Sequence, residues 1–162
     1  MKKKKKFLVV LGGGGHTLQM IKLLDLLGKR YIYEYVVKYE DPLSNKKIKI
    51  KGKTYKFHEP RAFRDNFFVT IFKLMRNIIE SLIILFKSRP DVIISAGAGP
   101  AVPISILGKF FGIKIIFLES WSRVYNPSVS GKIVYHFADL FFVQWPDLLK
   151  KYPKAIYAGR LM

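Results

Sequence analysis

A run of four glycines offers the first candidate for chemistry in this 162-residue chain. It consists of Gly12, Gly13, Gly14 and Gly15, and it separates a short apolar stretch from His16, Thr17 and an apolar segment with helical spacing. Strand, glycine turn and helix start in this order are typical of phosphate sites in α/β proteins, because glycine lets the backbone approach a ligand and the helix N-terminus presents free amides. We therefore expect a phosphate-bearing ligand here, although a tight turn without a ligand would give the same pattern.

The details of this turn disfavour two common nucleotide-binding classes. The dinucleotide fingerprint requires a third glycine where Thr17 stands, and the acidic residue of the next expected strand, Glu34, lies inside that strand rather than at its end. The Gly-Lys-Ser/Thr sequence of a Walker-type ATPase is absent. A nicotinamide enzyme and a Walker-type ATPase are therefore disfavoured.

Two further loops with chemical potential are expected at the ends of buried strands. One carries Gly97 and Gly99, whose backbone amides can also meet a ligand. The other gathers a carboxylate, two hydroxyls and a guanidinium within five residues, namely Glu119, Ser120, Ser122 and Arg123. A carboxylate beside hydroxyls suits sugar hydroxyls or general-base chemistry, and a guanidinium suits a phosphate. The alternative is an ion pair between Glu119 and Arg123 that only orders the loop.

Composition indicates the kind of partner. The chain has 29 Lys and Arg against 11 Asp and Glu, a formal charge of +18, which predicts an anionic partner. Much of the excess is Lys in two clusters, at 2–6 and 46–56, and no nucleic-acid module is recognisable, so a phosphate or an anionic membrane is favoured over nucleic acid. The chain contains no cysteine and its three histidines lie far apart, so we expect neither a metal site nor a cofactor.

The elements that position these loops are expected to form a doubly wound α/β sheet. Short apolar runs at 7–11, 31–38, 91–95, 114–118 and 140–143 predict strands, mostly parallel and buried on both faces, and 17–27 predicts a buried helix. Ligands of such a sheet bind at the carboxyl ends of its strands. The segment 46–58 alternates apolar and polar residues around Gly52, which we interpret as a hairpin or an extended arm.

The segment 67–87 is long enough to cross a bilayer, but its charged residues argue against spanning. Its polar residues recur at steps of three and four and form one stripe of a helix: Asn66, Thr70, Lys73, Arg76, Asn77, Glu80, Ser81 and Lys87. The remaining arc is wider than a helix lying on a sheet normally buries, so we expect part of it to face lipid or a partner, with a thoroughly buried core helix as the alternative. The candidate membrane residues are Phe67, Phe68, Phe72, Met75 and Ile79.

Together with the basic residues 1–6, this helix predicts peripheral attachment to an anionic membrane surface. The apolar stretch 7–11 is too short for a signal peptide, and no transmembrane helix is expected. We therefore expect the protein on the cytoplasmic face of a membrane.

Segments spread in order over nearly the whole chain resemble the asparagine-linked glycosylation subunit fourteen family, which also includes bacterial capsule and exopolysaccharide subunits. The matching segments are 13–20, 89–91, 119–124, 130–132, 144–148 and 157–159, and the most specific are Glu-Ser-Trp-Ser-Arg and Gln-Trp-Pro. The resemblance implies that residues 1–162 form a single Rossmann-like domain, equivalent to the N-terminal, acceptor-side half of a GT-B glycosyltransferase.

The resemblance also implies an activity shared between two chains. A separate nucleotide-sugar-binding subunit would complete an inverting transferase that moves N-acetylglucosamine from UDP-N-acetylglucosamine to a polyprenyl or dolichyl diphosphate-linked sugar, and this chain would be inactive alone. Eukaryotic members usually carry an N-terminal transmembrane helix, which residues 1–6 and 67–87 would have to replace here. The competing interpretations are a non-catalytic peripheral membrane scaffold, a subunit for another sugar in exopolysaccharide synthesis, and a basic nucleic-acid binder.

Roles for individual residues follow from the same resemblance. His16 would bind the acceptor diphosphate or assist the acceptor hydroxyl, the alternative being a helix-start residue that bonds the backbone. Glu119 and Arg123 would face the cleft between the two chains, with Glu119 as the other catalytic candidate. Gln144 and Trp145 would help to dock the partner, unless the tryptophan is buried in the core. The residues expected to bind the acceptor diphosphate are Gly12, Gly13, Gly14, Gly15, Thr17, Gly97, Gly99, Ser120 and Arg123.

Overall fold

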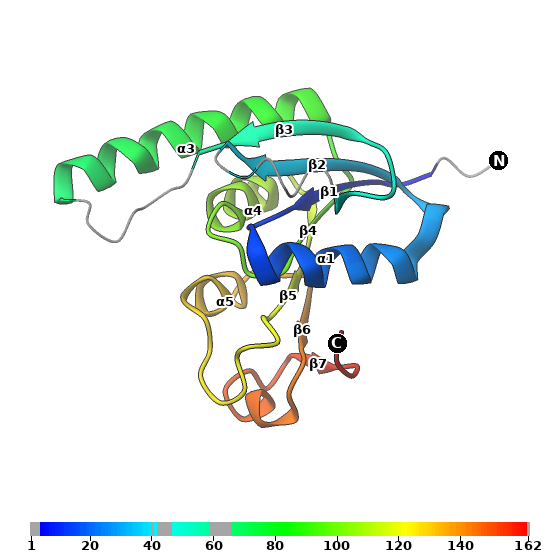
Figure 1. The fold of residues 1–162 in the computed structure, drawn as a ribbon. Helices are drawn as coiled ribbons and strands as arrows, with labels where there is room; N and C mark the ends of the chain where they lie inside the picture. Colours follow the sequence, from blue (N-terminus) through cyan, green and yellow to red (C-terminus); the bar gives the residue numbers. More distant parts are fainter. Residues whose placement is uncertain (1–3, 40, 42–46, 59–65, 162) are drawn as a thin grey trace.

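A computed structural model describes residues 4–39, 41, 47–58 and 66–161, without the side chain of Phe67. Its centre is one parallel sheet of seven strands in the order β3-β2-β1-β4-β5-β6-β7 (Figure 1). The strands are β1 (Lys6–Val10), β2 (Ile32–Lys38), β3 (Lys53–Phe57), β4 (Val92–Ser95), β5 (Lys114–Leu118), β6 (Leu140–Val143) and β7 (Ile156–Tyr157). The helices are α1 (Gly14–Leu27), α3 (Phe67–Ser88), α4 (Ala101–Phe110) and α5 (Val129–Val134), with 3₁₀ turns η1 (Gly28–Arg30) and η2 (Pro146–Lys150).

The strand order reverses between β1 and β4, which confirms the expected doubly wound sheet. Chain order runs from β1 outward to β3 on one side and from β4 outward to β7 on the other. After the neighbouring strands β1 and β4 the chain therefore turns toward opposite sides of the sheet. Open parallel sheets bind their ligands at this kind of topological switch point. The glycine loop follows β1 and the loop with Gly97 and Gly99 follows β4, so the topology brings these two predicted loops together.

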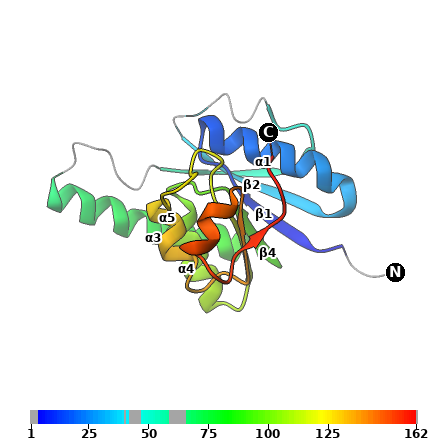
Figure 2. The same cartoon turned by 90° about the horizontal axis from the view of Figure 1, so that it is seen from below.

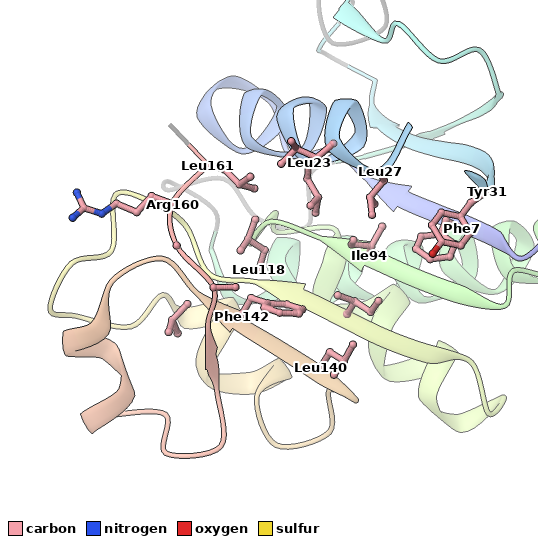
Figure 3. Close-up of a pocket in the computed structure, with 15 residues that line it drawn as sticks. Phe7, Leu23, Leu27, Tyr31, Ile94, Leu118, Leu140, Phe142, Arg160 and Leu161 are labelled. Atoms are coloured by element: carbon pink, nitrogen blue, oxygen red, sulfur yellow. The ribbon is translucent and has the colours of Figure 1, made fainter. Parts of the chain in front are cut away.

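The two faces of the sheet carry different covers. On one face α3, α4 and α5 enclose a core that includes Ile84, Ile104 and Val134. On the other face α1 packs over β1, β2 and β4 through residues such as Met20 and Leu24. Beyond α1 an apolar cavity of about 420 Å³ remains above β5 and β6. It is bounded by Leu23 and Leu27 of α1 and by residues 158–161 after β7, which we call the C-terminal tail (Figure 3). This second face is thus only partly covered within the described chain.

The hairpin or arm expected at 46–58 is wrong for the described residues 47–58, while Lys46 lies outside them. Residues 53–57 form β3, which pairs in parallel with β2 and makes one edge of the sheet. The backbone already packs against β2 at Gly52, just before β3 begins. A Cβ at this position would collide with the carbonyl oxygen of Tyr33, so the close approach requires glycine. Lys53 and Lys56 remain exposed on this edge, where charged side chains hinder pairing with other strands.

Helix α3 turns its polar stripe toward the protein and its apolar arc outward. Asn77 and Ser81 are fully buried, and the Glu80 carboxylate accepts a 3.1 Å hydrogen bond from the backbone N–H of His58 at the end of β3. Exposed apolar residues fill the opposite side: Phe68, Val69, Ile71, Phe72, Leu74, Met75, Ile78, Ile79, Ile83 and Phe86. The interpretation as a thoroughly buried core helix is therefore wrong, since among the described side chains of α3 the buried apolar residues, Ile84 and Leu85, lie in its C-terminal turns.

The N-terminal part of α3 projects beyond the ends of the strands in both views (Figures 1 and 2). This is the carboxyl edge, because α3 runs back from that edge toward the start of β4. Across the described ranges, the helices are all too short or too polar to cross a membrane.

The outward orientation of α3 predicts unequal effects of two alanine substitutions. Ile84→Ala removes a side chain that is 4% exposed and should lower the free energy of unfolding by about 2–5 kcal/mol. Phe72→Ala removes one that is 69% exposed and should change it by no more than about 0.5 kcal/mol. Urea denaturation measures both. Equal losses for the two variants would contradict the orientation of the helix.

Candidate functional site

The glycine loop has the backbone geometry that its sequence predicts. Gly13 and Gly14 have φ angles of 82° and 54°, a left-handed region that favours glycine. Helix α1 begins at Gly14, and the amide of Gly13 donates to the Thr17 hydroxyl at 3.0 Å. The next amides at the helix start have no acceptor within the helix. They are therefore available to an anion at the positive end of the helix dipole.

The loop after β4 lies directly against the glycine loop. A Cβ at Gly12 would stand only 3.0 Å from Cα of Ala98, so the two loops touch through their backbones. Gly97 has a φ of 88°, and a Cβ there would lie 3.4 Å from Cε1 of His16. These contacts confirm that the two glycine loops meet, as the strand topology requires.

His16 spans the two loops through a hydrogen bond. Its Nδ1 lies 2.5 Å from the carbonyl oxygen of Ala96, and because a carbonyl only accepts, Nδ1 carries the proton in this contact. In the neutral imidazole Nε2 then keeps its lone pair. His16 thus bonds the backbone, as the alternative to a catalytic role expected, and this bond fixes the tautomer of the neutral ring.

The Glu119 carboxylate is fully buried, in contrast to its expected position facing the cleft. One oxygen accepts from the amide of Ser120 at 2.9 Å. The other accepts from the amide and hydroxyl of Ser128, both at 3.1 Å, and from the Tyr152 hydroxyl at 3.2 Å. Burial, followed by the adjacent Glu119 charge, raises the pKa of Tyr152 far above its ordinary value, so this hydroxyl stays a donor.

Arg123 makes no ion pair with Glu119, so that alternative is wrong as well. Its side chain is exposed, and its backbone amide donates to the carbonyl of Ser120 at 2.9 Å. The physical reason is that Glu119 points into the interior, where hydroxyl and amide donors satisfy it without a cation. The Arg123 side chain therefore lies at the surface.

A second group of buried polar side chains ties the site to the C-terminal tail. The Gln19 side-chain oxygen accepts from the amide of Trp121 at 3.1 Å and from the side-chain nitrogen of Gln144 at 2.6 Å. The same Gln144 nitrogen donates to the backbone carbonyl of Glu119 at 3.0 Å, and the Gln144 oxygen accepts from the amide of Leu161 at 2.9 Å. This network joins α1, the loop after β5 and the tail.

The placement of Gln144 corrects its expected role. It is 1% exposed and engaged on all sides, so its side chain offers no surface to a partner and instead holds the tail. Trp145 is half-buried: its indole N–H donates to the carbonyl of Trp121 at 2.6 Å, and the Arg160 guanidinium lies 4.0 Å from its ring centre. The surface near Trp145 is thus formed by Arg160 and the tail.

An open cavity of about 330 Å³ lies where three loops meet, namely the glycine loop, the loop after β4 and the loop after β5. Its lining is polar on the side of the loops and apolar on the side of the helices. The lining residues are His16, Gly97, Gly99, Val102, Ser122, Arg123, Ser128, Val129, Ser130 and Ile133. Of the expected phosphate residues, Thr17 and Ser120 are instead buried, where Thr17 holds the glycine turn and Ser120 bonds Glu119 and neighbouring side chains. Among the residues that the structure describes, no three His, Asp or Glu side chains gather to hold a metal ion.

Three residues of this region escaped the sequence reasoning. Gln19 sits in an apolar helix, where a polar residue at a buried position is the available signal. Ser128 caps the start of α5, where its hydroxyl accepts from the amide of Gly131 at 2.8 Å, and a serine just after Pro127 is a helix-start signal that could have indicated this role. Asp41 lies beyond the end of β2, and its carboxylate would be 3.1 Å from a Cβ on Gly13. An acidic residue therefore does stand near the glycine loop, contrary to the expectation from Glu34.

Comparisons with known proteins agree with this geometry. The family described as "Oligosaccharide biosynthesis protein Alg14 like" matches residues 7–161. The UDP-N-acetylglucosamine transferase subunit alg14 of Schizosaccharomyces pombe is 37% identical over 164 residues, which cover 90% of this chain and 78% of that protein. The human subunit ALG14 is 31% identical over 171 residues, with 92% and 79% covered.

Solved structures share the fold at low identity. MurG of Acinetobacter baumannii superposes with a TM-score of 0.71 at 14% identity, covering 88% of this chain and 42% of that one. UDP-N-acetylglucosamine 2-epimerase of Rickettsia bellii gives 0.72 at 17% identity, covering 99% and 46%. The chain spans less than half of each of these proteins. It has the Rossmann-like architecture expected for one half of a GT-B glycosyltransferase.

The earlier resemblance is confirmed by a match that runs from the first strand to the tail. Because the family match covers residues 7–161 and the human relative is 31% identical with 79% of its length covered, the chain belongs to the Alg14-like family of oligosaccharide biosynthesis proteins.

Proposed function

We propose that this chain is the membrane-attached, acceptor-binding subunit of a two-chain N-acetylglucosaminyltransferase. It binds a prenyl diphosphate-linked sugar and brings the nucleotide-sugar-binding subunit to the membrane. The observation that carries the proposal is the hydrogen bond from His16 Nδ1 to the Ala96 carbonyl, which holds the imidazole between two glycine loops beside the start of α1. The names of the relatives, UDP-N-acetylglucosamine transferase subunits, supply the donor class.

The diphosphate of the acceptor binds where the three loops meet. The exposed Arg123 guanidinium lines the cavity, and the first amides of α1 lie beside it, next to the lining residue His16. Gly97 and Gly99 keep the second loop free of side chains, so the backbone can approach the phosphate oxygens.

His16 serves as the general base. The acceptor hydroxyl oxygen forms a bond to the anomeric carbon of the donor sugar, and the bond between that carbon and the diphosphate of UDP breaks on the opposite side. The hydroxyl proton passes to Nε2 of His16, while the Ala96 carbonyl keeps the ring oriented and stabilises the imidazolium that forms. The inverted configuration follows from this single displacement. Since the partner holds the donor, the chain alone is inactive.

Membrane attachment uses the outward face of α3. A contiguous apolar surface of this size on a helix that buries its own polar stripe is typical of an interaction with lipid or protein. Lysines on the neighbouring β3 edge, Lys53 and Lys56, favour an anionic bilayer. The expected contact residues Phe68, Phe72, Met75 and Ile79 all lie on this face, and the side chain of Phe67 falls outside the described structure.

The partner subunit docks on the half-covered face of the sheet. The apolar cavity beside α1 and the tail offers buried area, and Arg160 points away from it at the rim (Figure 3). The tail is fixed from below by Gln144 through the amide of Leu161, so the docking surface and the loop after β5 share one hydrogen-bond network.

The direct test is transfer on liposomes that contain a prenyl diphosphate-linked N-acetylglucosamine, with labelled UDP-N-acetylglucosamine and a donor panel. Transfer should require both chains. A stable, membrane-bound pair that transfers no sugar from any donor would favour the scaffold function instead.

The role of His16 predicts a selective loss of turnover. His16→Ala should lower kcat of the assembled pair by about 10²–10⁴-fold, the usual contribution of a general base. Vesicle binding and pairing with the partner should be unchanged. His136→Ala, at an exposed histidine outside the site, is the matched control and should retain full activity. Normal turnover in His16→Ala would refute this assignment.

The buried position of Glu119 predicts that its loss acts through structure. Glu119→Gln places an amide NH₂ where hydroxyl and amide donors point, so the free energy of unfolding should fall by about 2–3 kcal/mol. Asp147→Asn, at a half-exposed carboxylate, should stay within about 0.5 kcal/mol. Urea denaturation and transfer are measured together. Unchanged stability with abolished transfer would make Glu119 catalytic after all.

The membrane face predicts a weaker vesicle affinity when it is made polar. Phe72→Ser combined with Met75→Ser should reduce binding to anionic vesicles at least tenfold, because burial of each side chain contributes about 1.5–3 kcal/mol. Leu26→Ser changes a side chain of similar exposure, 71%, on α1 and should bind as the unmodified chain does. Co-sedimentation measures both, and equal binding by all three proteins would exclude α3 as the attachment site.

A further inference from the structure

The cavity at the carboxyl edge has two chemically different walls. The loop side presents His16 and Arg123 to an anion. The opposite wall is formed by Val102 at the start of α4 and by Val129 and Ile133 of α5. Val129 and Ile133 lie four residues apart on one side of their helix, and they are 76% and 41% exposed. A ligand that fits both walls carries an anionic group joined to a hydrocarbon.

The apolar wall continues along α4. Ile106 and Phe110 follow Val102 at intervals of four residues, so the three share one stripe of the helix. Ile106 is 36% exposed and Phe110 86%. The stripe is about 12 Å long by the rise of an α-helix. At its far end Phe111 packs edge-on against Phe86 of α3, with ring centres 5.4 Å apart. The far end of the stripe therefore lies beside the last turn of α3, where the outward face of that helix ends.

We propose that the groove between α4 and α5 holds the first isoprene units of the acceptor lipid. The inference rests on the proposed function, since it takes the diphosphate to lie among the three loops. A prenyl chain attached to that diphosphate has to leave the cavity through one of its walls, and only the side formed by Val102, Val129 and Ile133 is apolar. From there the chain follows α4 toward the membrane face, so hydrocarbon is shielded from water along its path.

The groove then contributes to acceptor selection. A diphosphate without a hydrocarbon chain binds through the loops alone, and the apolar wall stays exposed to water. A prenyl diphosphate gains the burial of its first units, about 25 cal/mol for each Å² of apolar surface removed from water.

Binding to the isolated chain tests this directly, with inorganic diphosphate and geranyl diphosphate as probes in calorimetry. We expect geranyl diphosphate to bind at least tenfold more tightly than diphosphate. Val129→Ser with Ile133→Ser should remove most of this difference and leave diphosphate binding unchanged. Both positions are exposed, so the fold should tolerate the substitutions. Val129→Asp alone is a second variant that should have the same effect, and thermal unfolding checks that each variant is folded.

The controls separate the groove from the proposed function. Arg123→Ala should weaken both probes about equally, and Leu26→Ser on α1 should affect neither. Equal affinity of the unmodified chain for the two probes would overturn the groove while leaving the diphosphate site intact. A preference for geranyl diphosphate over diphosphate that survives the α5 substitutions would also overturn it. Absence of binding of either probe, or binding that ignores Arg123, would overturn the diphosphate site and the groove together.

Discussion

A buried carboxylate without a cation is the constraint on which the carboxyl edge of this protein depends. A carboxyl group in the interior has to be satisfied by hydrogen-bond donors, and for Glu119 the chain supplies them from Ser120, Ser128 and Tyr152. The Ser128 hydroxyl also accepts a hydrogen bond from the amide of Gly131, so the same contacts fix the start of α5. The position of α5 then decides where Val129 and the apolar wall of the cavity lie. Glu119 thus shapes the site without facing it.

The second organising feature is α3, a helix whose polar side faces the protein and whose apolar side faces outward. Helix α3 buries polar residues such as Asn77 and Ser81 and exposes a row of large apolar side chains. In water this arrangement forgoes much hydrophobic stabilisation, whereas at a bilayer or protein surface it gains it. Since the N-terminal end of α3 projects past the carboxyl edge (Figure 1), the proposed membrane face begins at the same edge as the cavity proposed for the acceptor. In the proposed function, a lipid-linked acceptor reaches the loops without leaving the membrane.

Sequence patterns were sufficient for local structure and insufficient for long-range polar contacts. Apolar runs and glycine turns predicted the central strands and the first two loops, because burial and backbone freedom are local properties. The polar stripe of α3 was visible, but which side faces the sheet depends on contacts with His58 at the end of β3. The bond between Gln19 and Gln144 joins residues 125 positions apart and leaves no periodic signal. For the same reason Glu119 was expected in the cleft, since a charge in a loop gives no indication of internal donors.

Amide hydrogen exchange would test most directly whether acceptor binding and membrane attachment share the carboxyl edge. The chain is compared free, with anionic vesicles, and with the same vesicles containing prenyl diphosphate-linked N-acetylglucosamine. The account predicts added protection in α3 with vesicles alone, and in the loops around Gly14, Gly97 and Ser122 only when the acceptor is present. Protection confined to the basic segments, with the loops and α3 unchanged in all three samples, would contradict it.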